Sequence, residues 1–223
     1  MNYPNNPTTA FASLEFFTEV VNLCLKYNVY ILSDIAYSEI YFNESPPPSI
    51  LQVPRALEIA VEFSSLSKTY SMPGWRIGFA VGNNKLIAAL AKIKSYLDYG
   101  AFTPVQVAGI AALNGPQECV KEIRKIYLNR RNTLVGGFNR IGWNMDLPLG
   151  TMFVWAPIPE RFKSIGSLEF SKILLKNGKV AVAPGIGFGS KGEGFVRIGL
   201  VENEHRIRQA IKNVKIFFDT YGN

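Results

Sequence analysis

The first part of the chain alternates between helix-like and strand-like patterns. Residues 13–27 repeat apolar side chains every three or four positions, which is typical of an amphipathic helix, and Ser13 is placed to cap its first turn. Three short apolar runs rich in β-branched residues predict strands buried on both faces, at residues 29–33, 60–64 and 77–81. Strands that alternate with helices favour an α/β fold with a mainly parallel sheet and flanking helices.

The second part of the chain predicts a different arrangement, with helices before strands. Helical patterns dominate at residues 84–98 and 103–113 and in a long run after Pro116. Strand candidates follow at 152–156, 180–183 and 195–200, with further helices at 167–177 and 204–219. We therefore expect two domains, a partial large domain over residues 1–118 and a smaller C-terminal α+β domain over residues 119–223.

Composition limits the possible functions. The 223 residues are 48% hydrophobic and 18% charged, which is enough to bury a core. No apolar stretch is long enough to cross a bilayer and the two cysteines suggest no disulfide framework, so we expect a cytoplasmic protein that binds no membrane. The net charge of +7 comes from Lys and Arg scattered among acidic residues, which argues against nucleic acid and favours small anions with phosphate or carboxylate groups. His205 lies in a helical pattern beside Glu202, Glu204 and Arg206, which is typical of a solvated helix face and not of a metal-binding cluster, so no metal site is predicted.

A lysine, Lys68, follows the second predicted strand in a turn rich in hydroxyls and glycines. Ser65, Ser67 and Arg76 lie within twelve residues of chain and could converge on a phosphate, because hydroxyl and guanidinium groups suit a dianion. Lys68 could form an imine with an aldehyde cofactor once it is neutral. An ordinary lysine in a solvated loop is the alternative.

Asp34 and Tyr37 follow the first predicted strand, where ligands collect in α/β sheets. The Asp34 carboxylate could pair with a cationic ring nitrogen of a cofactor, and the Tyr37 hydroxyl could reach a phenolate oxygen on the same ring. The alternatives are a helix cap for Asp34 and a packed aromatic for Tyr37.

Asn6 and Arg197 are two further candidates near the two ends of the chain. Asn6 lies in a turn-rich segment, where its amide could hydrogen-bond a phenolate oxygen or serve the loop alone. Arg197 lies in an apolar strand, where an unpaired guanidinium is costly, so it should meet a carboxylate from the protein or from a substrate.

These motifs, in this order and over essentially the whole chain, resemble the class I pyridoxal-phosphate aminotransferases of fold type I. Within that family the chain is most similar to the bacterial alanine (glutamate–pyruvate) aminotransferases. The matching motifs are Asn5-Asn6-Pro7-Thr8, Asp34-Ile35-Ala36-Tyr37, Ser65-Leu66-Ser67-Lys68, Gly74-Trp75-Arg76-Ile77-Gly78 and Phe195-Val196-Arg197.

The resemblance implies pyridoxal 5'-phosphate as the cofactor and a role for each candidate residue. Lys68 would hold the cofactor and move a proton between the substrate Cα and the cofactor. The other roles implied are Asp34 on the pyridinium nitrogen, Tyr37 and Asn6 on the ring oxygen, Ser65, Ser67 and Arg76 on the phosphate, and Asn6 and Arg197 on the substrate.

The reaction implied is transfer of an amino group between an L-amino acid and a 2-oxo acid, with alanine and glutamate favoured and aspartate as a further candidate. A C–S lyase-like enzyme of the same fold type and a non-catalytic fragment are the alternatives. Family members are much longer than this chain, so the resemblance implies the C-terminal portion of an enzyme that is a homodimer at full length. We expect the 223-residue chain alone to be weakly active or inactive.

Overall fold

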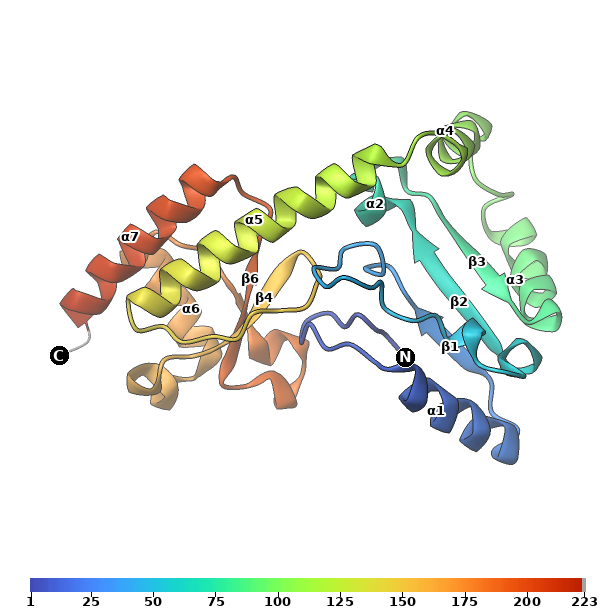
Figure 1. Cartoon of the computed structure of the whole chain (residues 1–223). Helices are drawn as coiled ribbons and strands as arrows, with labels where there is room; N and C mark the ends of the chain where they lie inside the picture. The colour runs from blue at the N-terminus through green and yellow to red at the C-terminus, as the bar shows by residue number, and fades with distance from the viewer. Residues whose placement is uncertain (222–223) are drawn as a thin grey trace. The chain divides into compact units, whose positions relative to one another are not determined.

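The computed structural model describes residues 1–221, and its contacts divide the chain into two compact units (Figure 1). The first unit contains Met1–Asn6 and Ala10–Arg124, and the second contains Pro7–Thr9 and Lys125–Asn223. No helix in the described part of the chain is both long and apolar enough to cross a membrane.

A three-stranded sheet organises the first unit, with β1 (Ile31–Asp34), β2 (Ala60–Ser65) and β3 (Gly78–Gly82) in that order. The pairing of β1 with β2 is parallel, as predicted, but β3 runs antiparallel to β2. The chain turns back because the segment between β2 and β3 forms only the one-turn helix α2 (Leu66–Thr69) and a short 3-10 turn, without a crossover helix. The carboxyl ends of β1 and β2 therefore meet at the edge of the sheet where β3 begins.

The predicted N-terminal helix is confirmed as α1 (Leu14–Tyr27). Ser13 caps it by accepting a hydrogen bond from the backbone N–H of Phe16 at 3.2 Å. Phe17 and Val21 on one face of α1 are buried in a core cluster with strand residues, including Ile31.

Burial on both faces, predicted for the first and third strands, is wrong. Leu32 in β1 is 57% exposed, and Phe79 and Val81 in β3 are 41% and 45% exposed. Their faces stay open because the helices after β3, α3 (Asn84–Leu97) and α4 (Thr103–Asn114), bury almost nothing; α3 has no buried residue.

An antiparallel sheet organises the second unit, in the order β4 (Phe153–Pro157), β6 (Phe195–Gly199) and β5 (Ala183–Pro184). One face of this sheet is buried, through alternate residues such as Val154 and Val196. The helices of this part of the chain are α6 (Gly166–Gly178), α7 (Glu204–Tyr221) and most of α5 (Glu118–Arg140), which begins in the first unit. The predicted strand at 180–183 shrinks to the two residues of β5.

Candidate functional site

The turn that carries Lys68 is fixed by hydrogen bonds at both ends. Ser65, the last residue of β2, caps α2 by accepting a bond from the Ser67 N–H at 3.2 Å. The Leu66 N–H donates to the carbonyl of Ile77 at 3.2 Å, which ties the turn to the segment before β3. Lys68 thus lies one helical turn beyond the carboxyl end of β2, in a half-buried position.

Tyr37 is the side chain that the structure brings to Lys68. The Lys68 Nζ atom lies 5.8 Å from the centroid of the Tyr37 ring. Tyr37 follows β1 by three residues, and the parallel register sets Asp34 beside Phe63 of β2. The strand ends therefore gather three of the predicted residues, Asp34, Tyr37 and Lys68, at one edge of the sheet.

Asp34 also has a structural role. Its Oδ1 atom accepts a hydrogen bond from the Ala36 N–H at 3.0 Å and so fixes the turn after β1. The side chain is exposed, and a carboxylate has acceptor capacity beyond one bond. The turn and a contact to a cationic ring nitrogen are therefore compatible.

Asn6 is linked to the same edge through Asn2, a residue that the sequence did not single out. Asn2 forms a parallel bridge with Asp34, and its Nδ2 donates to the Asp34 carbonyl at 3.2 Å. The Asn2 Oδ1 atom accepts the N–H of Asn6 at 2.8 Å. An asparagine in a turn-rich segment gave no signal of this link, because its partner lies 32 residues away.

Arg76 and Ser65 share the edge at which β3 begins. Arg76 precedes Gly78 by two residues, and Gly78 pairs with Ser65 in the β2–β3 register. Arg76 is exposed, has a left-handed backbone with φ of 50°, and donates from Nη1 to the carbonyl of Pro73 at 3.1 Å. Ser67, the third predicted phosphate ligand, is 7% exposed in α2.

Arg197 lies in β6 of the second unit, opposite Trp155 of β4 and Ala183 of β5. Its guanidinium carbon is 5.1 Å from the ring centroid of Phe153 and 4.8 Å from that of Phe188. A carboxylate partner for Arg197, from the protein or from a substrate, stays a prediction beside these ring contacts. Two aromatic rings hold this cation by cation–π attraction.

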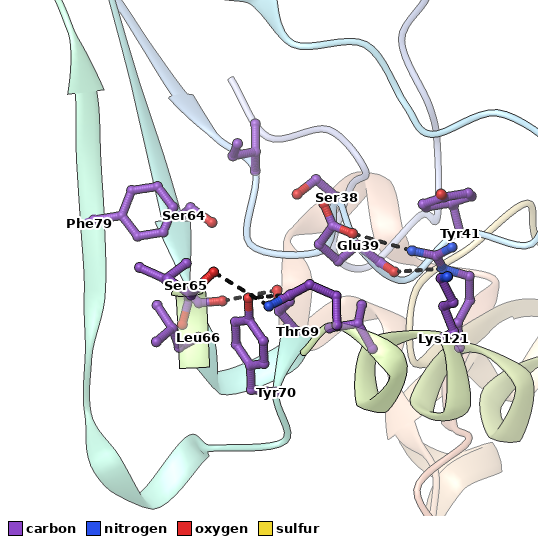
Figure 2. A pocket seen from close by; sticks show the side chains of 15 residues that line it. Ser38, Glu39, Tyr41, Ser64, Ser65, Leu66, Thr69, Tyr70, Phe79 and Lys121 are labelled. Atoms are coloured by element: carbon purple, nitrogen blue, oxygen red, sulfur yellow. Dashed lines mark hydrogen bonds and ion pairs between the residues drawn. The ribbon is translucent and has the colours of Figure 1, made fainter. Parts of the chain in front are cut away.

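A cavity of about 420 Å³ adjoins the Lys68 turn in the first unit, and Figure 2 shows the side chains that line it. Ser65 is the one predicted site residue among the lining residues, with Thr69 beside it. Arg124, which also lines the cavity, donates to the carbonyl and the carboxylate of Glu39 at 3.1 and 3.3 Å, and its guanidinium carbon lies 3.7 Å from the centroid of the Tyr41 ring. The sequence did not reveal this cavity, because Arg124 and Glu39 are 85 residues apart.

Tyr70 lines the same cavity, next to Thr69 in the chain. Its hydroxyl donates to Oε1 of Gln117 at 2.8 Å. Burial raises the pKa of Tyr70, and the hydrogen bond to Gln117 partly offsets this. The phenol is therefore a neutral donor at physiological pH.

Comparisons with known proteins place the whole chain in one family. Residues 1–214 match the model of the family described as aminotransferase class I and II. The glutamate–pyruvate aminotransferase AlaC of Escherichia coli is 52% identical over 222 residues, which cover 100% of this chain and 54% of AlaC. An LL-diaminopimelate aminotransferase of Moorella thermoacetica is 46% identical, over 96% of this chain and 54% of its own length.

Solved structures give the same result. The substrate-bound structure of BacF from Bacillus subtilis superposes with a TM-score of 0.93 at 36% identity, over 97% of this chain and 55% of BacF. The chain thus has the α/β fold of these aminotransferases, although it spans about half the length of the curated relatives it matches. The chain belongs to the class I and II aminotransferase family.

Proposed function

We propose that the protein is an aminotransferase that depends on pyridoxal 5'-phosphate and moves an amino group between an L-amino acid and a 2-oxo acid. The observation that carries the proposal is the position of Lys68, beyond the end of β2 and 5.8 Å from the Tyr37 ring, with Asp34 at the end of the neighbouring parallel strand. Members of this family use this cofactor.

The residues at the sheet edge fit the cofactor by their chemistry. A primary amine suits its aldehyde, a carboxylate its protonated ring nitrogen and a phenol its ring oxygen, which are the groups that Lys68, Asp34 and Tyr37 supply. Asn6, held through Asn2, adds an amide donor for the ring oxygen and for the substrate. When bound, the cofactor stores the electron pair of a broken bond at the substrate Cα.

Three further residues supply donors for a phosphate. The Ser65 Oγ atom accepts a hydrogen bond from the Ser67 N–H, so its own hydroxyl hydrogen remains to be donated. We assign Ser65, Ser67 and Arg76 to the phosphate, since hydroxyl and guanidinium donors around a dianion form charge-assisted bonds.

Lys68 has two duties in this proposal: its amine holds the cofactor, then takes a proton from the substrate Cα and returns it to the cofactor. Tyr37 and Asp34 keep the ring oriented while this proton moves. A C–S lyase would share these residues and differ in the bond that breaks.

Arg197 would bind the α-carboxylate of the substrate. The rings of Phe153 and Phe188 lie near the guanidinium, and its planar shape keeps its N–H groups in one plane. Those N–H groups form the fork that matches a carboxylate.

The name of the relative AlaC, a glutamate–pyruvate aminotransferase, supports alanine and glutamate as substrates, with aspartate as a further candidate.

The full-length protein would be a cytoplasmic homodimer. Its two cysteines, Cys24 and Cys119, are free thiols, which suits a reducing compartment. The exposed apolar residues that follow the end of α3, chiefly Tyr99 and Phe102 at 93% and 74% exposure, favour a second copy as partner.

The proposal is tested by titrating the purified chain with pyridoxal phosphate. We expect a visible absorption band, and borohydride should fix the cofactor on Lys68, as peptide mass mapping would show. Lys68→Ala should lose both signals, whereas Lys121→Ala, a lysine of the neighbouring cavity, should keep them. A folded chain without the band would refute the proposed cofactor site.

Half-reactions separate transamination from lyase chemistry. With alanine, glutamate or aspartate, the chain loaded with cofactor should slowly yield the aminated cofactor and the matching 2-oxo acid, because only weak activity is expected of the chain alone. Cleavage of a C–S substrate without aminated cofactor would instead support the lyase.

A further inference from the structure

The glycine-rich loop between β5 and β6 is a closed structure. The backbones of Gly185 and Gly192 approach so closely that neither position has room for a Cβ atom. Gly189, between them, has a φ of 112°, which favours glycine. The loop thus has one compact shape. The hydrogen bonds that join it to the rest of the second unit therefore determine where its side chains lie.

The carboxylate of Glu193 holds the end of this loop. Its Oε1 atom accepts the N–H of Ser167 at 2.6 Å and the N–H of Gly194 at 2.9 Å, and its Oε2 accepts the Ser167 hydroxyl at 3.0 Å. These N–H groups lower the pKa of Glu193, so the side chain is ionised at neutral pH.

Ser167 extends the same network to the start of the loop. It is fully buried in the first turn of α6, and its Oγ atom accepts the N–H of Ile186 at 3.1 Å. One hydroxyl thus donates to Glu193 and accepts from Ile186, so both ends of the loop are bonded to α6.

The loop carries Phe188, whose ring covers the guanidinium of Arg197 at 4.8 Å. The same ring meets Trp155 edge-on, with centroids 5.8 Å apart at 85°. Trp155 lies opposite Arg197 in the sheet. The position of the loop therefore decides whether the guanidinium keeps this aromatic neighbour.

We propose that Glu193 is a positioning residue for ligand binding: its carboxylate fastens the glycine-rich loop to α6, so that Phe188 holds the Arg197 guanidinium in the plane in which it meets a carboxylate. That the ligand of Arg197 carries a carboxylate rests on the proposed function. The fastening itself does not depend on it and can be measured without any ligand.

The first test is hydrogen exchange in the 223-residue chain without ligand. Glu193→Ala and Ser167→Ala should each raise the exchange rate of the Ile186 amide by about tenfold or more, since each removes hydrogen bonds to a charged group. Glu193→Gln, which keeps an acceptor oxygen, should have a smaller effect. The control is Glu169→Ala, which removes an exposed ion pair with Lys172 on α6 and should leave the loop unchanged.

The second test is binding of maleate, a small dicarboxylate, to the chain loaded with pyridoxal phosphate. Glu193→Ala should weaken maleate binding about tenfold while the cofactor band stays as in the wild type, with Glu193→Gln in between. Unchanged exchange at Ile186, or faster exchange with unchanged maleate affinity, would overturn the role of Glu193 alone. A wild-type chain that binds no maleate would overturn the role of Arg197 and this inference with it. If the cofactor band is missing while the Ile186 amide exchanges slowly, the proposed cofactor site is wrong and the fastening of the loop stands.

Discussion

Single residues at the ends of β1 and β2 serve the local backbone and the candidate chemistry together. Asp34 accepts the Ala36 N–H, and Ser65 accepts the Ser67 N–H. From the sequence alone, a structural cap was the alternative to a functional role for Asp34. The geometry allows both roles, because each side chain keeps hydrogen-bonding capacity after the turn is formed.

Asp34→Asn separates the two duties. Asparagine can still accept the Ala36 N–H, so the free energy of unfolding should change by less than about 1 kcal/mol. The negative charge is lost, so the affinity for pyridoxal phosphate, measured by absorption titration, should fall about tenfold or more. Asp98→Asn, in an exposed pair with Lys94, should not change that affinity. Equal affinities in wild type and Asp34→Asn would remove Asp34 from the cofactor site.

Glu193 predicts a dependence of stability on pH. Hydrogen bonds hold its folded-state pKa below the ordinary value of 4.5, so the folded state binds fewer protons than the unfolded state near that pH. The stabilisation is therefore complete above the ordinary value and is lost as the pH falls through the folded-state pKa. Urea unfolding should show an advantage of wild type over Glu193→Gln at about pH 6 that shrinks at about pH 3. An advantage that is constant over this range would contradict the assignment.

At the scale of elements, local patterns predicted most helices and strands, but not their surroundings. Apolar spacing and Ser13 placed α1, since a helix depends on residues three or four apart. The exposure of Leu32 depends on what covers β1, and the direction of β3 depends on the turn that precedes it. The residues of a strand do not determine either of these. The link from Asn2 to Asp34 joins distant segments and has no local signature.

Glu62 ties two elements together. It is 3% exposed in β2, and its carboxylate accepts the Ser49 hydroxyl at 2.7 Å and the Ile50 N–H at 2.9 Å, at the start of the 3-10 turn Ile50–Gln52. Glu62→Ala should lower the free energy of unfolding by roughly 2–4 kcal/mol, because it leaves buried donors without partners. Urea denaturation measures this loss. Glu58→Ala, in an exposed pair with Arg55, should cost less than about 1 kcal/mol, and equal losses would refute the role of Glu62.

At the scale of the whole molecule, each unit keeps its own part of the candidate chemistry. The first contains Lys68 and the groups around it, and the second contains Arg197 and its loop. The superposition on BacF covers 97% of this chain and 55% of BacF, so both units together correspond to about half of that solved structure.

The exposed apolar residues of the first unit predict association. Tyr96, Leu97, Tyr99 and Phe102 are 74% to 93% exposed, more than a stable monomer usually leaves open in one segment. Sedimentation of the 223-residue chain should show dimers or larger species, and replacing Tyr99 and Phe102 by Ser should shift the balance toward monomer. Leu57→Ser, at 60% exposure elsewhere in this unit, should leave it unchanged. A monomeric wild type would exclude this surface as a contact between copies.

The register between β1 and β2 sets where Asp34 lies relative to the turn that carries Lys68. A slip of two residues would keep each side chain on its own face of the sheet, and the helices and core would persist. Asp34, now opposite Phe63, would shift by about 6.5 Å along the strand, away from the turn after β2. Asn28, in a left-handed conformation, ends α1 just before the chain enters β1, and its backbone N–H bonds to the carbonyls of Cys24 and Leu25. An insertion at that point would give a protein that folds and keeps its circular dichroism spectrum, but whose Asp34 is out of alignment with Lys68.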